Sequence, residues 1–178
     1  MPPVPQLTRL NPVGLPDGGL KQFYDEFRLP GTIPLDLTRA FNQKITAPSP
    51  LGPGNLTELD LTITDHPDRD GYYQLITLDG IKVSFERPPP PLFSRSTNAG
   101  FRQLALEPLP RAGLKLVEGK IARIFKRYPG RIWRIVRIED LNGNAITLDR
   151  DEAGLLQRLT HPDGLQLEFL NGPDGLRT

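Results

Sequence analysis

The sequence predicts an all-β protein built from short antiparallel strands and hairpins, and three observations support this class. The 17 glycines and 20 prolines make about a fifth of the 178 residues, against roughly 12% in an average protein. They recur every several residues, with short apolar segments of alternating pattern between them, as expected for strands joined by turns. In the last third, several positions repeat every 21 residues, which places one hairpin in each unit.

Composition excludes several kinds of site and partner. The chain has no cysteine, so disulfides, thiolate metal sites and cysteine nucleophiles are excluded. Its two histidines, His66 and His161, lie far apart in the sequence. The 22 basic and 21 acidic side chains give a net charge of +1, which gives no global argument for a nucleic-acid or membrane partner. We expect no membrane segment, because no apolar run approaches the roughly 20 residues of a spanning helix.

The first half of the chain is expected to contain a leader and a β module. Residues 1–20 predict an irregular leader, because prolines and glycines leave no window for a regular element. Residues 21–91 predict the module. Within it, residues 35–41 and 59–64 alternate between apolar and polar side chains, which indicates strands.

The clearest predicted hairpin surrounds Asp79-Gly80. The segments 72–78 and 81–85 flank this dipeptide, which suits a tight turn because both residues tolerate positive φ. The four prolines of Pro88–Pro91 are interpreted as a stiff spacer, with a ligand for proline-reading modules as the alternative.

The second half is expected to form a connector, residues 92–113, and repeat strands, residues 114–178. Short apolar segments return from Leu114 onward. Residues 121–128 also fit the spacing of a helix ended by Pro129-Gly130. The surrounding β pattern favours a strand.

The 21-residue spacing relates turn glycines and apolar positions alike. Gly143 matches Gly164, and Gly154 matches Gly175; these glycines are expected to permit the repeat turns. The matched apolar pairs are Ile138 and Leu159, Ile146 and Leu167, Leu148 and Phe169, and Leu155 and Leu176. Because a single hairpin cannot bury its apolar face, stacked units are expected to bury it against one another.

Two segments resemble the bacterial Rhs family. The stretch Ile138–Asn144 and the repeats after it look like tyrosine–aspartate (YD) repeats. The stretch Asp25–Leu35, with Leu-Pro-Gly and Pro-Leu, is followed by Arg39 and Phe41 and resembles the opening of the Rhs core. Together these motifs cover most of residues 12–178.

The repeats are degenerate. Arg150-Asp151 and Asn171-Gly172 stand where a Tyr-Asp pair would be. Complete Rhs proteins carry many more repeats, wound into a hollow β-shell that encloses a C-terminal toxin. The resemblance therefore implies the N-terminal part of such a shell.

The implied function is that of a non-enzymatic structural segment in interbacterial toxin delivery, commonly with type VI secretion. The implied partners are the remaining shell, the enclosed toxin and secretion spike proteins. The implied location is the bacterial cytoplasm before export. That export would be independent of a signal peptide, since no basic region leads into an apolar stretch at the N-terminus. The expected packing residues are Leu29, Leu35, Phe41, Ile81, Phe85, Trp133, Ile138, Leu148 and Phe169.

No catalytic residue, metal ligand or cofactor is predicted. The segments 65–71 and 140–151 are rich in oxygen ligands, but neither has the spacing of a calcium loop, and turns explain their Asp and Asn residues. A hydrolase using Asp140, Asp151 and His161 is kept as an alternative.

A basic stretch provides the main alternative function, a small β-rich nucleic-acid-binding protein. Its cations are Lys120, Arg123, Lys126, Arg127, Arg131, Arg134 and Arg137, interleaved with Phe125, Tyr128 and Trp133. Cations beside stacking aromatic rings are typical of single-strand binding surfaces. The competing interpretation is a solvated strand face paired with nearby acids. Since neighbouring strand residues face opposite sides, we expect the cations to divide between two faces and do not expect nucleic acid as a partner.

Overall fold

The computed structural model describes residues 20–43, 49, 51–89 and 92–172. The expected leader, apart from Leu20, and the repeat glycine Gly175 lie outside these ranges. The all-β class is confirmed: the described residues form strands and three short 3-10 turns, η1 (Glu58–Asp60), η2 (Ala99–Phe101) and η3 (Pro110–Ala112).

The strands form two antiparallel sheets. The smaller sheet has the order β1 (Lys21–Leu29), β2 (Leu35–Asn42) and β3 (Asn55–Thr57). The larger sheet contains β4 (Thr62–Asp65), β5 (Tyr72–Ile76), β6 (Lys82–Glu86), β7 (Ser94–Arg95), β8 (Ala105–Leu109), β9 (Gly113–Glu118), β10 (Ile121–Tyr128), β11 (Ile132–Asp140), β12 (Ala145–Arg150), β13 (Leu156–Thr160) and β14 (Gln166–Glu168).

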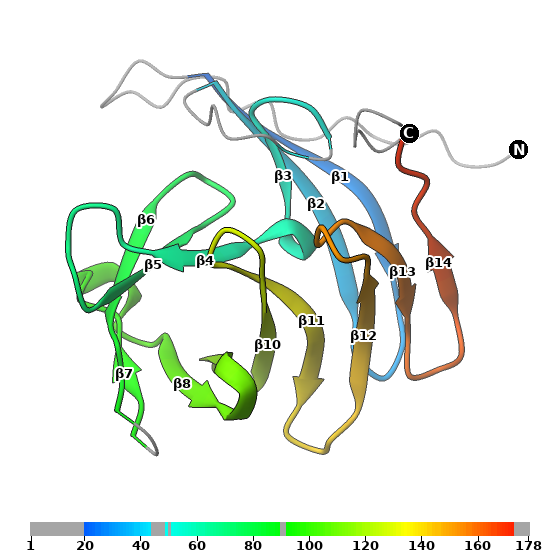
Figure 1. Cartoon of the computed structure of the whole chain (residues 1–178). Helices are drawn as coiled ribbons and strands as arrows, with labels where there is room; N and C mark the ends of the chain where they lie inside the picture. The colour runs from blue at the N-terminus through cyan, green and yellow to red at the C-terminus, as the bar shows by residue number, and fades with distance from the viewer. Residues whose placement is uncertain (1–19, 44–48, 50, 90–91, 173–178) are drawn as a thin grey trace, which may run out of the picture.

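Strands β4 to β11 form a nearly closed barrel (Figure 1). Within β4–β6 and within β7–β11 each strand pairs with its neighbour in sequence, and β11 returns to pair with β4. The barrel is weakest between β6 and β7, where one isolated bridge joins Phe85 of β6 to Ser96, the residue after β7. There the side chain of Asn98 accepts a hydrogen bond from the Ser84 nitrogen at 2.9 Å and donates one to the Lys82 oxygen at 3.2 Å. The amide side chain thus adds to the backbone bond from the Thr97 nitrogen to the Ser84 oxygen at this junction.

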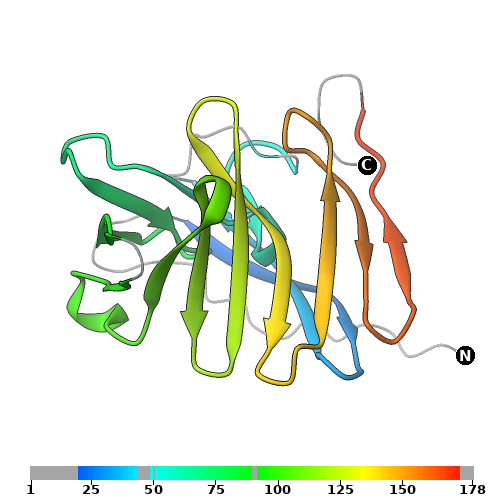
Figure 2. The ribbon, with the colours of Figure 1, turned by 60° about the horizontal axis from the view of Figure 1, so that its bottom comes forward.

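Strand β11 has two different partners along its length. Residues 132–134 pair with β4, whereas residues 137–139 pair with β12. Strands β12 to β14 therefore leave the barrel as an open wing. Sheet β1–β3 packs behind this wing (Figures 1 and 2), and one hydrophobic core joins the barrel, the wing and the small sheet.

The core contains most of the residues expected to pack. Leu35, Phe85, Trp133, Ile138 and Leu148 are buried. Leu29, Phe41 and Phe169 are half-buried. Ile81 is 38% exposed, because it closes a turn instead of entering strand β6.

Four hairpin turns of the larger sheet share one geometry. In each, the first residue donates its N–H to the oxygen of the fifth, and the fourth, a glycine, donates to the oxygen of the first. The turns are Thr77–Ile81, Asp140–Asn144, Asp151–Leu155 and His161–Leu165. Their glycines have φ between +80° and +90°, the left-handed region that side chains disfavour. The hairpin expected at Asp79-Gly80 is therefore present with a longer loop, in which only Gly80 has positive φ.

The last three of these turns produce the 21-residue spacing. They follow one another after 11 and 10 residues, so successive turns lie at opposite ends of the wing strands (Figure 2). The structure places Gly143, Gly154 and Gly164 at the fourth position of these turns.

Two local expectations differ from the structure. Residues 59–61, expected to be in a strand, lie in and just after η1, where Thr57 donates its hydroxyl to Asp60 at 2.8 Å and favours a turn. Residues 92–113, expected to be a connector, contribute β7 and β8 to the barrel. The segment 121–128, which also fitted a helix, forms β10.

Candidate functional site: a cationic pocket at the end of β10 and β11

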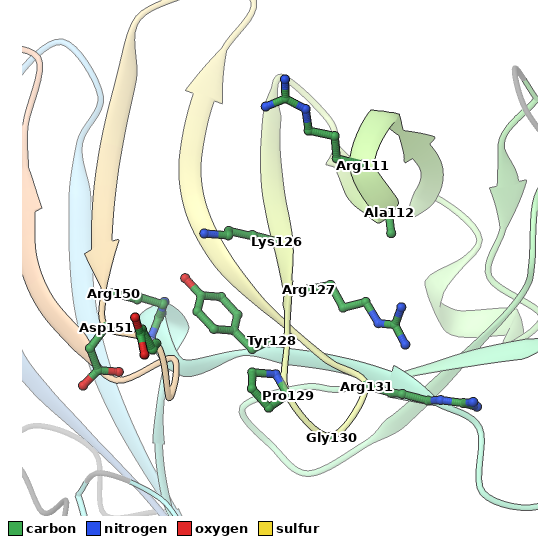
Figure 3. A pocket seen from close by; sticks show the side chains of 11 residues that line it. Arg111, Ala112, Lys126, Arg127, Tyr128, Pro129, Gly130, Arg131, Arg150 and Asp151 are labelled. Atoms are coloured by element: carbon green, nitrogen blue, oxygen red, sulfur yellow. The ribbon is translucent and has the colours of Figure 1, made fainter.

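An open pocket of about 680 Å³ lies at the turn that joins β10 to β11. Its other walls are the η3 turn and the beginning of the turn after β12 (Figure 3). The cationic residues that line it are Arg111, Lys126, Arg127, Arg131 and Arg150. Two acidic residues, Asp151 and Glu152, lie on one wall. Volumes of this size are typical of small-molecule sites.

The pocket is lined by residues with an unusual backbone conformation. Arg111, Ala112 and Arg131 are the described residues other than glycine with positive φ, each at +58°, and all three line the pocket. This conformation costs roughly 1–2 kcal/mol per residue. Trp133 holds one of them in place, because its indole nitrogen donates to the Ala112 oxygen at 2.7 Å. Such backbone often accompanies a functional site.

The pocket cations differ in their partners. Arg131 forms an ion pair with Asp65 at 3.3 Å, and Asp65 also pairs with Arg87 at 2.6 Å. The Arg127 guanidinium lies 5.5 Å from the centre of a Trp133 ring. Among the described residues, no carboxylate forms an ion pair with Arg127.

The same holds for Arg111 and Lys126 within the described ranges. Both side chains are exposed. Lys126 places its ammonium 5.5 Å from the Tyr128 ring centre. The pocket lining therefore carries more positive than negative charge, with five cationic residues against Asp151 and Glu152.

Arg150 has a structural role at the edge of the pocket. Its guanidinium donates to the oxygens of Ile135 at 2.7 Å, of Gly154 at 3.0 Å, and of Leu59. It therefore ties β11, the turn after β12 and η1 together. Burial raises the pKa of the nearby Tyr128 hydroxyl, an effect that Arg150 partly opposes, so Tyr128 enters the site as a neutral phenol.

The strand register divides the predicted basic stretch between two faces. Phe125 is opposite Ile135, and Arg127 is opposite Trp133. Because opposite residues share a face, Arg127 lies on the side of the barrel core. Lys126, which neighbours Arg127 in the strand, lies on the other face. This geometry interrupts a continuous basic surface.

The rest of the basic stretch lies outside the pocket. Arg123 pairs with Glu118 at 2.8 Å, and Arg137 pairs with Glu139 at 3.1 Å. Arg134 is half-buried, and burial lowers its pKa. Lys120 is exposed at the turn between β9 and β10.

Four residues that line the pocket lie outside the basic stretch predicted from the sequence: Arg111, Arg150, Asp151 and Glu152. Arg111 comes from a weakly patterned segment and carries no sequence signal. Arg150 and Asp151 occupy the Tyr-Asp position of the repeat, and Asp151 is also one of the residues of the alternative hydrolase. Glu152 carries no sequence signal.

The three aromatic residues of the basic stretch are buried. Phe125 is 1% exposed, Trp133 5% and Tyr128 9%. Base stacking needs an exposed ring face. The structure thus places cations at the surface, but these three rings are not available to stack on the bases of a single strand.

The residues of the alternative hydrolase do not meet in one place. Asp140 and Asp151 lie at opposite ends of β12, which separates them by roughly 20 Å at 3.3 Å per residue. Asp140 accepts hydrogen bonds from Asn142 and from Asn144, which lower its pKa. In the described part of the chain, no group of three or more metal-ligating side chains comes together.

The fold and site define an antiparallel β-barrel protein with an open strand wing and a cationic pocket. No family model matches the sequence. No curated protein matches it either. Of the residues described, none belongs to a helix long and apolar enough to cross a bilayer.

Proposed function

We propose that this chain is a non-enzymatic structural segment of an Rhs-type shell that encloses a toxin for delivery between bacteria. One observation carries the proposal: the two segments that resemble the family contact each other. They are the opening Leu-Pro-Gly segment, which forms the loop between β1 and β2, and the repeat turn His161–Leu165.

The contact is made by hydrogen bonds that span 131 positions of the sequence. Asp163 accepts from the Thr32 nitrogen at 2.9 Å and from its hydroxyl at 2.5 Å. His161 is buried and donates from Nε2 to the Ile33 oxygen at 2.8 Å. A Cβ atom on Gly31 would lie 2.2 Å from the Asp163 carboxylate, so the glycine of the opening motif is needed for the close approach. The opening loop and the repeat turn therefore stabilise each other through these contacts.

The wing supplies the surface on which further repeats would stack. β14 pairs with β13, and its other edge has no strand partner in the described ranges. The flanking residues Leu165 and Leu170 are 43% and 69% exposed. A free strand edge beside apolar side chains favours addition of another strand. In this proposal, the next hairpin of the shell pairs there.

The partners and location follow from the same resemblance. The remaining shell and the enclosed toxin lie in the same polypeptide or a processed fragment, and secretion spike proteins bind the assembled container. The proposed location is the bacterial cytoplasm before export. In this proposal the residues of the chain pack the core and form the turns, and none is assigned a catalytic step.

The test is native purification from the source cell, followed by intact mass measurement. We expect these residues in a polypeptide or stable complex well above 19.9 kDa, with additional segments that carry glycine turns every 10–11 residues. Recovery only as a 19.9 kDa monomer would refute the proposal.

A matched pair of variants tests the wing edge within that complex. Leu170→Lys places a charge beside β14, whereas Leu141→Lys places one at the turn after β11, where the side chain is 76% exposed. We expect the first variant to weaken association and the second to leave it unchanged. Equal behaviour of the two variants would remove the wing edge from the proposal.

A further inference from the structure

We propose that the cationic pocket binds a chain of phosphate groups through Arg111, Lys126, Arg127 and Arg131. The inference concerns ligand binding and is independent of the shell proposal. The nucleic-acid alternative above used the whole basic stretch and both bases and phosphates. Here only the pocket residues bind, and they bind phosphate alone.

Charge balance is the first argument. Arg111, Lys126 and Arg127 have no ion-paired carboxylate among the described residues. The partner of Arg131 is Asp65, whose carboxylate also pairs with Arg87 at the shorter distance of 2.6 Å. Arg131 can therefore turn to a ligand while Asp65 keeps its closer partner. A bound polyanion would neutralise charge that the fold leaves open.

The placement of the cations favours an extended ligand. Figure 3 shows Arg127 and Arg131 extending to one side of the β10–β11 turn and Lys126 to the other, with Arg111 on the neighbouring turn. Because the side chains extend to both sides of the turn, we infer a ligand of linked anionic groups instead of one compact ion. The pocket volume of about 680 Å³ accommodates such a ligand.

The backbone provides a second, independent argument. Two of the four cations, Arg111 and Arg131, occupy left-handed conformations at φ +58°, in which Asn or Gly would be less strained. Trp133 fixes the first of these turns through Ala112. The strained backbone thus presents arginine at two points of one pocket.

Phosphate fits the side chains better than carboxylate or a stacked base. Guanidinium groups donate paired hydrogen bonds to phosphate oxygens, and a tetrahedral phosphate offers oxygens to several of them at once. The buried rings of Tyr128 and Trp133 provide no platform for a base. Asp151 and Glu152 on one wall repel an anion, so the ligand is directed toward the arginines.

The test uses inorganic tripolyphosphate and the oligonucleotide dT12 as probes, with calorimetry on the intact chain. Trp133 is the only tryptophan and contacts Arg127, so its fluorescence reports on the pocket. We expect saturable binding that weakens with salt and changes Trp133 emission. The variant Arg111→Asn/Arg131→Asn should weaken it about tenfold or more, since Asn tolerates the left-handed backbone and circular dichroism can verify the fold.

The control variant is Lys82→Gln/Lys120→Gln, which removes the same charge at exposed positions outside the pocket. We expect it to bind within about twofold of the wild type. Tripolyphosphate binding identifies a free phosphate chain as sufficient, and dT12 binding alone identifies the nucleic-acid backbone as its source. An equal loss in both variants, no binding of either probe, or equally tight binding of hexaglutamate would overturn the proposal.

Discussion

A Cβ atom at Gly154 would lie only 2.7 Å from Cδ of Arg134. Gly154 is the fourth residue of the turn after β12 and is buried, so this contact seats the wing against β11. Gly143 has the same φ of +85° in the preceding turn but has no atom within 4 Å of the added position.

This pair separates backbone strain from steric fit. Gly143→Ala should destabilise the protein by about 1–2 kcal/mol, the cost of the left-handed conformation alone. Gly154→Ala should cost more than about 2 kcal/mol, because Arg134 must also move. Urea unfolding of both variants measures the difference, and equal costs would show that the Arg134 contact yields freely.

Arg150 should be a principal stabilising residue of the barrel–wing junction. Arg150→Met keeps most of the side-chain stem but leaves the carbonyls of Ile135, Gly154 and Leu59 without this donor. We expect a loss of about 2–4 kcal/mol. The exposed pair of Arg158 and Glu168 at 3.2 Å provides the control, since Arg158→Met should cost at most about 1 kcal/mol. Similar costs for both variants would contradict this role.

Asn98 should close the barrel between β6 and β7. Asn98→Ala removes the acceptor for the Ser84 nitrogen and the donor to the Lys82 oxygen. We expect a loss of about 1–2 kcal/mol and faster hydrogen exchange of the Ser84 amide. Asn98→Asp keeps only the acceptor and should protect Ser84 while stability remains reduced. Unchanged exchange in Asn98→Ala would show that the junction closes without this side chain.

Thr32→Val should weaken the contact between the opening loop and the repeat turn. The substitution removes the hydroxyl donor to Asp163 and keeps a similar volume. We expect a lower urea midpoint and a rise in the pKa of Asp163, because the Thr32 hydroxyl is the main cause of its lowered pKa. An NMR titration of Asp163 checks the second effect, and an unshifted pKa would exclude the hydroxyl as its cause.

The same contact should depend on pH. Because the folded protein lowers the pKa of Asp163, the stabilisation is present above the unfolded-state pKa of about 3.9. It is lost as the pH falls through the lower folded-state value. The difference in urea midpoint between wild type and Thr32→Val should therefore shrink between about pH 5 and about pH 2. Asp140 also has a lowered pKa, but it is present in both proteins and cancels in the comparison. A constant difference would contradict the linkage.

Local patterns in the sequence were enough to predict the β class and much of the wing. The hairpin at Gly80 and the spacing of Gly143 and Gly164 depend on short-range turn chemistry, which neighbouring residues determine. Residues 59–61 were assigned to a strand because Leu59 alternates with polar neighbours. Its burial instead comes from packing in the shared core, which periodicity does not distinguish from a strand face.

Long-range contacts could not be predicted in this way. The Thr32 and Asp163 pair, the Arg150 bonds to Ile135 and Leu59, and the Asn98 bridge each join separate segments. Strand β8 was missed because Pro108 weakens its pattern; it lies near the end of β8, beyond the residues that pair with β7, where a missing N–H is tolerated. Only part of the cationic pocket could be predicted, since Lys126, Arg127 and Arg131 are close in sequence, whereas Arg111 comes from η3 and Arg150 from the end of β12.

The divided pairing of β11 has a mechanical consequence. One half of this strand completes the barrel and the other half carries the wing, so both parts lose ladder hydrogen bonds if β11 is withdrawn. We therefore expect barrel and wing to melt as one cooperative unit. A pulling force on β14 would pass into the barrel through β11, and through the Arg150 bonds and the shared core beside it.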